Sequence, residues 1–128
     1  MSRDAPFFED LRVGQVERSA PAVTLTEGMA AVHQAIVGDR LPLALDRELA
    51  RSVLGTSTAL AHPALVWDVA IGQSTVLTGR VIANLFYRGL ALRRMPTIGD
   101  TLRTSTEVVA LRGRRPRPGR PASGLAAL

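Results

Sequence analysis

Apolar positions in the first part of the chain follow the period of a helix. They recur every three or four residues over 29–37, which predicts a helix there. Thr24 or Thr26 can cap its start, and Gly38 can adopt the backbone conformation that ends it. Before this helix, alternating Val and Thr over 16–25 predict a strand, placed at an edge or a bend because the segment contains a proline.

Two more helices are expected in the middle of the chain. Residues 39–45 contain a proline and are expected to form a loop, after which Asp46 can cap a short helix that runs to Leu54. Pro63 suits the first turn of the next helix, because its missing N–H would have no acceptor there. This helix, about 64–76, is apolar almost all round, so we expect it to be buried in the centre of a domain.

The second half of the chain changes to the pattern of strands. Residues 80–94 begin with β-branched and aromatic side chains and predict a long strand. A turn at 95–100 leads to a second long strand over 101–111. Residues 113–123 are rich in Arg, Pro and Gly and are expected to form an exposed loop, and 124–128 predict the opening of a third strand.

This order of elements predicts an α+β fold in which an antiparallel sheet wraps around a central apolar helix. The chain has 128 residues and no internal repeat, so we expect residues 1–128 to form one domain. Two long strands and a stub make a thin sheet for such a helix. The domain is therefore expected to be truncated at its C-terminal strands.

Composition narrows the class of protein. A share of 46% hydrophobic and 21% charged residues is typical of a globular chain. The absence of cysteine excludes disulfides, thiolate nucleophiles and thiolate metal ligands in this chain. The first residues lack the apolar segment of a signal peptide, and the longest apolar stretch, 59–71, is too short to span a bilayer. We therefore expect a cytoplasmic protein with no membrane partner.

The net charge of +5 belongs to one segment. Five arginines lie in 112–120 without an acidic neighbour, and the 11 basic and 11 acidic residues that remain balance each other. This segment has no interleaved aromatic side chains of the kind that stack on bases. A nucleic-acid partner is therefore not expected.

Several short motifs, in their order and spacing, carry a family resemblance. They are Phe8-Glu9-Asp10-Leu11, Val13-Gly14-Gln15, Gly38-Asp39-Arg40-Leu41-Pro42-Leu43-Ala44-Leu45-Asp46 with Leu49-Ala50, Ala61-His62-Pro63-Ala64-Leu65 and Gly99-Asp100-Thr101-Leu102. Each is weak by itself. Together they resemble the MaoC-like acyl-CoA dehydratases and hydratases, nearest to the N-terminal half of mesaconyl-CoA hydratase-like proteins.

The resemblance implies a hot-dog fold that acts on, or binds, enoyl-CoA or 3-hydroxyacyl-CoA thioesters. Coenzyme A would be part of the substrate, and no other cofactor and no metal is implied. In the family, an aspartate and a histidine handle the protons when water adds to or leaves the double bond. Asp39 matches the aspartate, but Ala44 stands where the family has the histidine.

Two functions therefore stay open. The chain is either a hydratase or dehydratase that works without the usual histidine, or a non-catalytic hot-dog module that shapes an acyl-CoA site together with a catalytic partner. Because hot-dog domains pair edge to edge, the resemblance also implies a homodimer or pairing with a related hot-dog subunit.

Five residues form the candidate site. Asp39 and His62 are the catalytic candidates, and Arg88, Arg93 and Arg94 are candidates for the phosphates of coenzyme A, which guanidinium groups fit well. His62 precedes a helix start, where backbone N–H groups can receive a thioester oxygen. Each candidate has a structural alternative: a loop aspartate bonding its own backbone, a helix-capping histidine and arginines on a solvated strand end.

Overall fold

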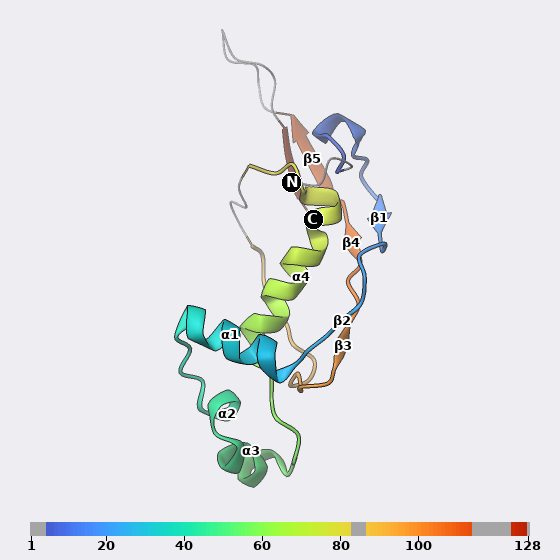
Figure 1. Cartoon of the computed structure of the whole chain (residues 1–128). Coiled ribbons are helices and arrows are strands. Elements are labelled where there is room, and N and C mark those ends of the chain that lie inside the picture. Colours follow the sequence, from blue (N-terminus) through green and yellow to red (C-terminus); the bar gives the residue numbers. More distant parts are fainter. Residues whose placement is uncertain (1–4, 83–86, 114–123, 128) are drawn as a thin grey trace. The chain divides into compact units, whose positions relative to one another are not determined.

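The structure of the chain is a computed structural model that describes residues 5–82, 87–113 and 124–127 (Figure 1). In chain order its elements are η1 (Phe8–Asp10), β1 (Val16–Glu17), β2 (Val23–Thr24), α1 (Glu27–Val37), α2 (Pro42–Leu45), α3 (Arg47–Leu54), α4 (Pro63–Thr78), β3 (Thr101–Leu102), β4 (Thr106–Glu107), β5 (Ala110–Gly113) and β6 (Gly124–Ala127). They divide into two compact units. Of the described residues, unit 1 holds 5–21, 73–82, 104–113 and 124–127, and unit 2 holds 22–72 and 87–103.

Unit 1 contains two small antiparallel sheets. In one of them β1 pairs with β4, and in the other β5 pairs with β6. The first pairing continues into the fully buried Val108, whose N–H donates to the carbonyl of Gln15 at 2.9 Å and whose carbonyl accepts from Gly14 at 2.8 Å. The buried amide of Gln73 is satisfied on both sides, because it donates to the carbonyl of Pro21 and accepts from the hydroxyl of Thr104.

Unit 2 joins its strands to the segment that precedes α4. β2 pairs antiparallel with β3, and Leu25 continues this pairing through hydrogen bonds with Asp100 (2.8 Å) and Gly99 (2.9 Å). The N–H of Ala61 donates to the carbonyl of Pro96 at 2.9 Å. Leu25, Ala61 and Leu65 form the buried cluster, with partly buried apolar side chains around it: Met29, Ala30, Val66, Val69, Ile98 and Leu102. This cluster therefore holds Ala61, the residue before His62, and Leu65 in the first turn of α4.

The predicted helices α1 and α3 are confirmed together with their end signals. The hydroxyl of Thr26 accepts from the N–H of Met29 at 3.2 Å, and Gly38 ends α1 in the left-handed region with φ of 60°. The Asp46 carboxylate accepts two N–H groups of the first turn of α3, and Gly55 ends α3 with φ of 66°. Local side-chain chemistry therefore sets both helices.

α4 is confirmed as the long helix after Pro63, but it is not buried all round. Leu65, Gln73 and Leu77 are buried, whereas Asp68 and two further residues at helical spacing, 72 and 75, form an exposed stripe. Among the described residues, no helix combines the length and the apolar character that a membrane span requires.

Other predicted elements need correction. The expected loop 39–45 contains the short helix α2, which starts at Pro42 as its first residue. The expected long strand 80–94 is absent from 80–82 and 87–94, while 83–86 lie outside the described residues. Ile82 is 99% exposed, and apolar β-formers support a strand only where a neighbouring strand or core covers them.

The expected second long strand over 101–111 is instead three short ones. β3 pairs with β2, β4 with β1, and β5 with β6, so the pairing partner changes twice along this segment. The partner segment 16–25 is itself interrupted around Pro21, which cannot donate a backbone hydrogen bond. The expected third strand is confirmed as β6, whereas 114–123 of the expected loop lie outside the described residues.

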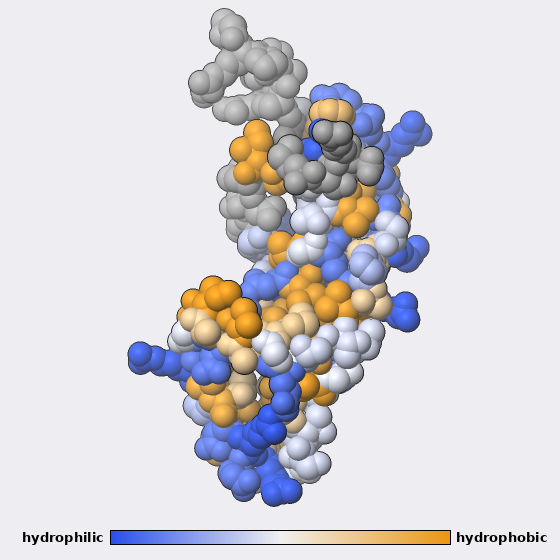
Figure 2. Space-filling model, in the orientation of Figure 1, coloured by the Kyte–Doolittle hydropathy of each residue, from blue (hydrophilic) through white to orange (hydrophobic). Residues whose placement is uncertain are grey.

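Apolar and polar side chains are unevenly distributed over unit 2. Figure 2 shows hydrophobic surface over α1, where Val32, Ile36 and Val37 are 50% or more exposed. The surface over α3 is hydrophilic in the same view and carries Arg47 and Arg51.

Candidate active site

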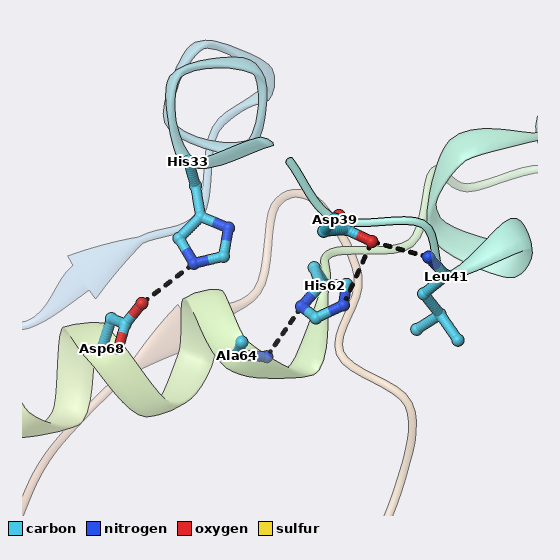
Figure 3. Close-up of polar contacts among 6 residues, drawn as sticks. All are labelled: His33, Asp39, Leu41, His62, Ala64 and Asp68. Atoms are coloured by element: carbon cyan, nitrogen blue, oxygen red, sulfur yellow. Dashed lines mark hydrogen bonds and ion pairs between the residues drawn. The ribbon is translucent and has the colours of Figure 1, made fainter. Parts of the chain in front are cut away.

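His62 is the residue immediately before α4, and its side chain caps the helix. Its Nδ1 accepts the N–H of Ala64 at 3.0 Å, so Nδ1 carries no proton and Nε2 does (Figure 3). Nε2 lies 3.3 Å from Oδ1 of Asp39. The ring nitrogen that carries the proton therefore faces the Asp39 carboxylate.

The first turn of α4 uses its own donors. Pro63 has no N–H, Ala64 donates to the His62 ring, and the N–H of Leu65 donates to the carbonyl of His62 at 3.0 Å. These residues therefore leave no uncommitted N–H for a thioester oxygen, contrary to what the position of His62 before a helix suggested.

Asp39 follows the glycine that ends α1, and its side chain is only 7% exposed. Its Oδ1 accepts the N–H of Leu41 at 2.7 Å and lies 3.3 Å from Nε2 of His62 (Figure 3). Among the described residues no hydrogen bond to Oδ2 is formed. Asp39 therefore forms a hydrogen bond within its own loop, which was the structural alternative to a catalytic role. It also contacts His62, the second catalytic candidate.

Both residues line a pocket of about 190 Å³ within unit 2. Its walls carry small and apolar side chains, among them Ala44, and a few polar groups. The lining residues are Glu27, Ala30, Ala31, Gln34, Asp39, Ala44, Leu45, Arg47, Ala59, Leu60, His62 and Ile98. A buried carboxylate with one uncommitted oxygen can exchange a proton with a small molecule in such a pocket. No group of three or more potential metal ligands occurs in the part of the chain that the structure describes.

A second histidine–aspartate pair lies beside the first. Nε2 of His33 lies 2.9 Å from Oδ2 of Asp68, and the His33 ring centre is 5.9 Å from that of His62 (Figure 3). The His33 side chain is only 9% exposed, and its Nδ1 is buried without a hydrogen-bond partner among the described residues. Nothing in the sequence pattern pointed to this pair, because its members lie on separate helices.

The three candidate arginines are not part of this pocket. Arg94 forms a two-pronged ion pair with Asp100, with N–O distances of 2.9 and 3.0 Å. Asp100 also accepts the N–H of Thr97 at 2.8 Å. The Arg94 guanidinium and this N–H lower the pKa of Asp100 to about 2, and the same pairing raises the pKa of Arg94. Arg88 and Arg93 are exposed.

The pairing of Asp100 makes a pH-dependent contribution to stability. An aspartate has a pKa of about 3.9 in an unfolded chain, so the contribution is complete above that value and is lost as the pH falls through about 2. We expect Asp100→Asn to lower the free energy of unfolding at pH 7 only slightly, because Arg94 is 69% exposed and water screens the pair. Urea unfolding of both proteins should show this gap nearly closed at pH 2. If the two proteins still differ in the free energy of unfolding at pH 2, the charge of Asp100 does not cause the difference.

Comparisons with known proteins agree with the fold. No family model matches the chain. The chain is 36% identical over 107 residues to Beta-methylmalyl-CoA dehydratase of Chloroflexus aurantiacus, which covers 83% of this chain and 30% of that protein. A solved conserved hypothetical protein of Mycobacterium tuberculosis with a double hot-dog fold is 59% identical, with a TM-score of 0.92, over 98% of this chain and 38% of that one. A solved structure named as a MaoC domain protein dehydratase of Chloroflexus aurantiacus is 33% identical, with a TM-score of 0.81, over 89% of this chain and 32% of that one.

These matches confirm the predicted resemblance to the MaoC-like dehydratases. The predicted α+β hot-dog fold is confirmed by these neighbours. The chain spans 30 to 38% of the length of the relatives named above. A single domain over 1–128 stays a prediction.

Proposed function

We propose that this chain binds enoyl-CoA or 3-hydroxyacyl-CoA thioesters and takes part in adding water to them or removing it. The observation that carries this proposal is the contact of Asp39 with His62 inside a small pocket. The family supports the substrate class, since one relative is named a CoA-thioester dehydratase. Coenzyme A enters as part of the substrate, without a further cofactor.

In the hydration direction, Asp39 Oδ2 takes a proton from water as the water oxygen bonds to Cβ of the enoyl group. The π electrons of the double bond move toward Cα, and the proton that Asp39 received then passes to Cα. Water is thereby added, and the carboxylate is restored. His62 helps to hold Asp39 in place, because its Nε2 lies 3.3 Å from Oδ1, the oxygen that takes no part in this transfer.

A non-catalytic module is the second candidate function. It is favoured by the methyl side chain of Ala44 in the pocket, at the position where the family resemblance implies a histidine. It is also favoured by His62, whose two nitrogens are already engaged. In this case the chain would form one wall of an acyl-CoA site and a catalytic hot-dog partner would supply the proton chemistry.

Two further parts of the proposal concern contacts outside the pocket. Arg88 and Arg93 would meet the phosphates of coenzyme A, since both are exposed and guanidinium groups bind phosphate in two-pronged fashion. Arg94 could join them only by giving up Asp100. The chain would pair with a second copy or with a related hot-dog subunit, because a relative that it covers to 38% has a double hot-dog fold.

The test is hydration of crotonyl-CoA and mesaconyl-CoA, followed by loss of the absorbance of the conjugated thioester. Binding of each thioester is measured by calorimetry, and the mass of the chain in solution is measured in the same samples. Turnover by the chain would support the hydratase and contradict the non-catalytic module. Binding without turnover would support the module. Absence of binding to every thioester would contradict both.

A further inference from the structure

One charged pair at the wall of the pocket bears on which acyl group can enter. Glu27 is the first residue of α1 and Arg47 is the first residue of α3, and both line the pocket. Nη2 of Arg47 donates to Oε1 of Glu27 at 2.6 Å. Arg47 is the single lysine or arginine among the lining residues that the structure describes.

This pair leaves the pocket without an available cation. The charge of Arg47 is neutralised by Glu27, and the His62 ring is neutral because Nδ1 accepts a backbone N–H. The Asp39 carboxylate lines the same small pocket. An acyl group that ends in a free carboxylate would therefore meet the like charge of Asp39 and no uncommitted positive group. Like-charge juxtaposition in a confined site lowers affinity.

Helix electrostatics assigns different roles to the two residues. A glutamate in the first turn of a helix is favoured by the helix dipole, whereas an arginine there is disfavoured. Glu27 therefore has a structural reason to be at the start of α1, but Arg47 gains nothing from its place at the start of α3. The ion pair with Glu27 is what compensates Arg47 at this position.

We propose that Glu27, by neutralising Arg47, makes this pocket select CoA thioesters whose acyl group is uncharged. The inference rests on the proposed function, because it concerns the acyl end of a thioester in the same pocket. It also separates this chain from its relative named Beta-methylmalyl-CoA dehydratase, because a β-methylmalyl group carries a free carboxylate besides its thioester.

Two saturated thioesters test the proposal without interference from turnover. Butyryl-CoA and succinyl-CoA have acyl chains of equal length, and they differ at the end, which is a methyl group in one and a carboxylate in the other. We expect the chain to bind butyryl-CoA about tenfold more tightly at low salt. The preference should shrink as salt is added, since Glu27 and Arg47 are each more than 60% exposed and screening acts on exposed charges.

Variants of two glutamates identify the residue responsible. Glu27→Gln frees Arg47 to meet the ligand carboxylate, so binding of succinyl-CoA should tighten by about tenfold, as expected for a charge-assisted hydrogen bond, while binding of butyryl-CoA stays the same. Glu48→Gln is the matched control, because Glu48 is exposed, lies on α3 and pairs with Arg51 at 3.9 Å instead of lining the pocket. It should change neither affinity.

The outcomes separate this inference from the proposed function. Equal binding of the two thioesters by the unmodified chain, or no change in Glu27→Gln, would overturn the selection by Glu27 and leave the thioester site standing. Failure of both thioesters to bind would overturn the proposed function, and the inference with it.

Discussion

Asp39→Asn is expected to lower the rate of enoyl-CoA hydration by about 100-fold or more, the range typical of a lost general acid or base. The amide is nearly the same size as the carboxylate, and its oxygen can still accept the N–H of Leu41 that Oδ1 accepts now. What the variant loses is the group that takes up a proton at Oδ2. Turnover should therefore fall with little change in the binding of butyryl-CoA.

Asp68→Asn is the control for this experiment. Asp68 also contacts a histidine, and its side chain is 57% exposed and outside the pocket lining. An asparagine oxygen can still accept the N–H of His33, so hydration should stay within about twofold of the unmodified chain, as for most exposed substitutions. An Asp39→Asn protein that keeps its full rate would remove Asp39 from the chemistry. Equal losses in both variants would point to a change in the fold of this region.

The sequence predicted best those features that depend on neighbours in the chain. Thr26, Gly38 and Asp46 mark helix ends through bonds that span two to four residues, and each lies where the pattern placed it. The strands were predicted poorly because their existence depends on a partner far along the chain. The segment 101–111 has the alternation of one strand, yet it pairs with three separate partners.

The candidate site shows the same division. Asp39 was indicated by the family resemblance and His62 by its place before a helix. Their 3.3 Å contact joins residues 23 positions apart, and no pattern of neighbouring residues predicts it. The pairing of His33 with Asp68 depends on how two helices meet. Glu27 and Arg47 resemble many other charged residues on helix surfaces until the pocket between them is known.

His62 links the stability of the fold to the geometry of the site. Its Nδ1 caps α4, and this bond is what leaves the proton on Nε2, facing Asp39. The residue before it, Ala61, is fully buried in the cluster with Leu25 and Leu65. The orientation of the imidazole therefore depends on the packing at the start of α4. A loss of packing there should disturb the contact between His62 and Asp39.

Leu25→Ala is expected to be the most damaging single substitution for stability. Leu25 is 1% exposed, and it packs against Ala61 and Leu65. Replacing a buried leucine by alanine leaves a cavity and lowers the free energy of unfolding by about 2–5 kcal/mol. A chain of this length has a total stability of about 6–19 kcal/mol, so the loss would be a large share of it.

Ile36→Ala is the matched control, since Ile36 is 78% exposed on α1 and should change stability by no more than about 0.5 kcal/mol. Urea unfolding measures both variants. An unchanged slope of the free energy of unfolding against urea concentration would show that only stability has changed. Because Leu25 supports the segment that orients His62, Leu25→Ala should also slow any hydration under conditions where the protein remains folded. An Ile36→Ala loss as large as that of Leu25→Ala would instead mean that the apolar face of α1 is covered in solution. A small loss in Leu25→Ala would mean that this cluster is not what holds the start of α4 in place.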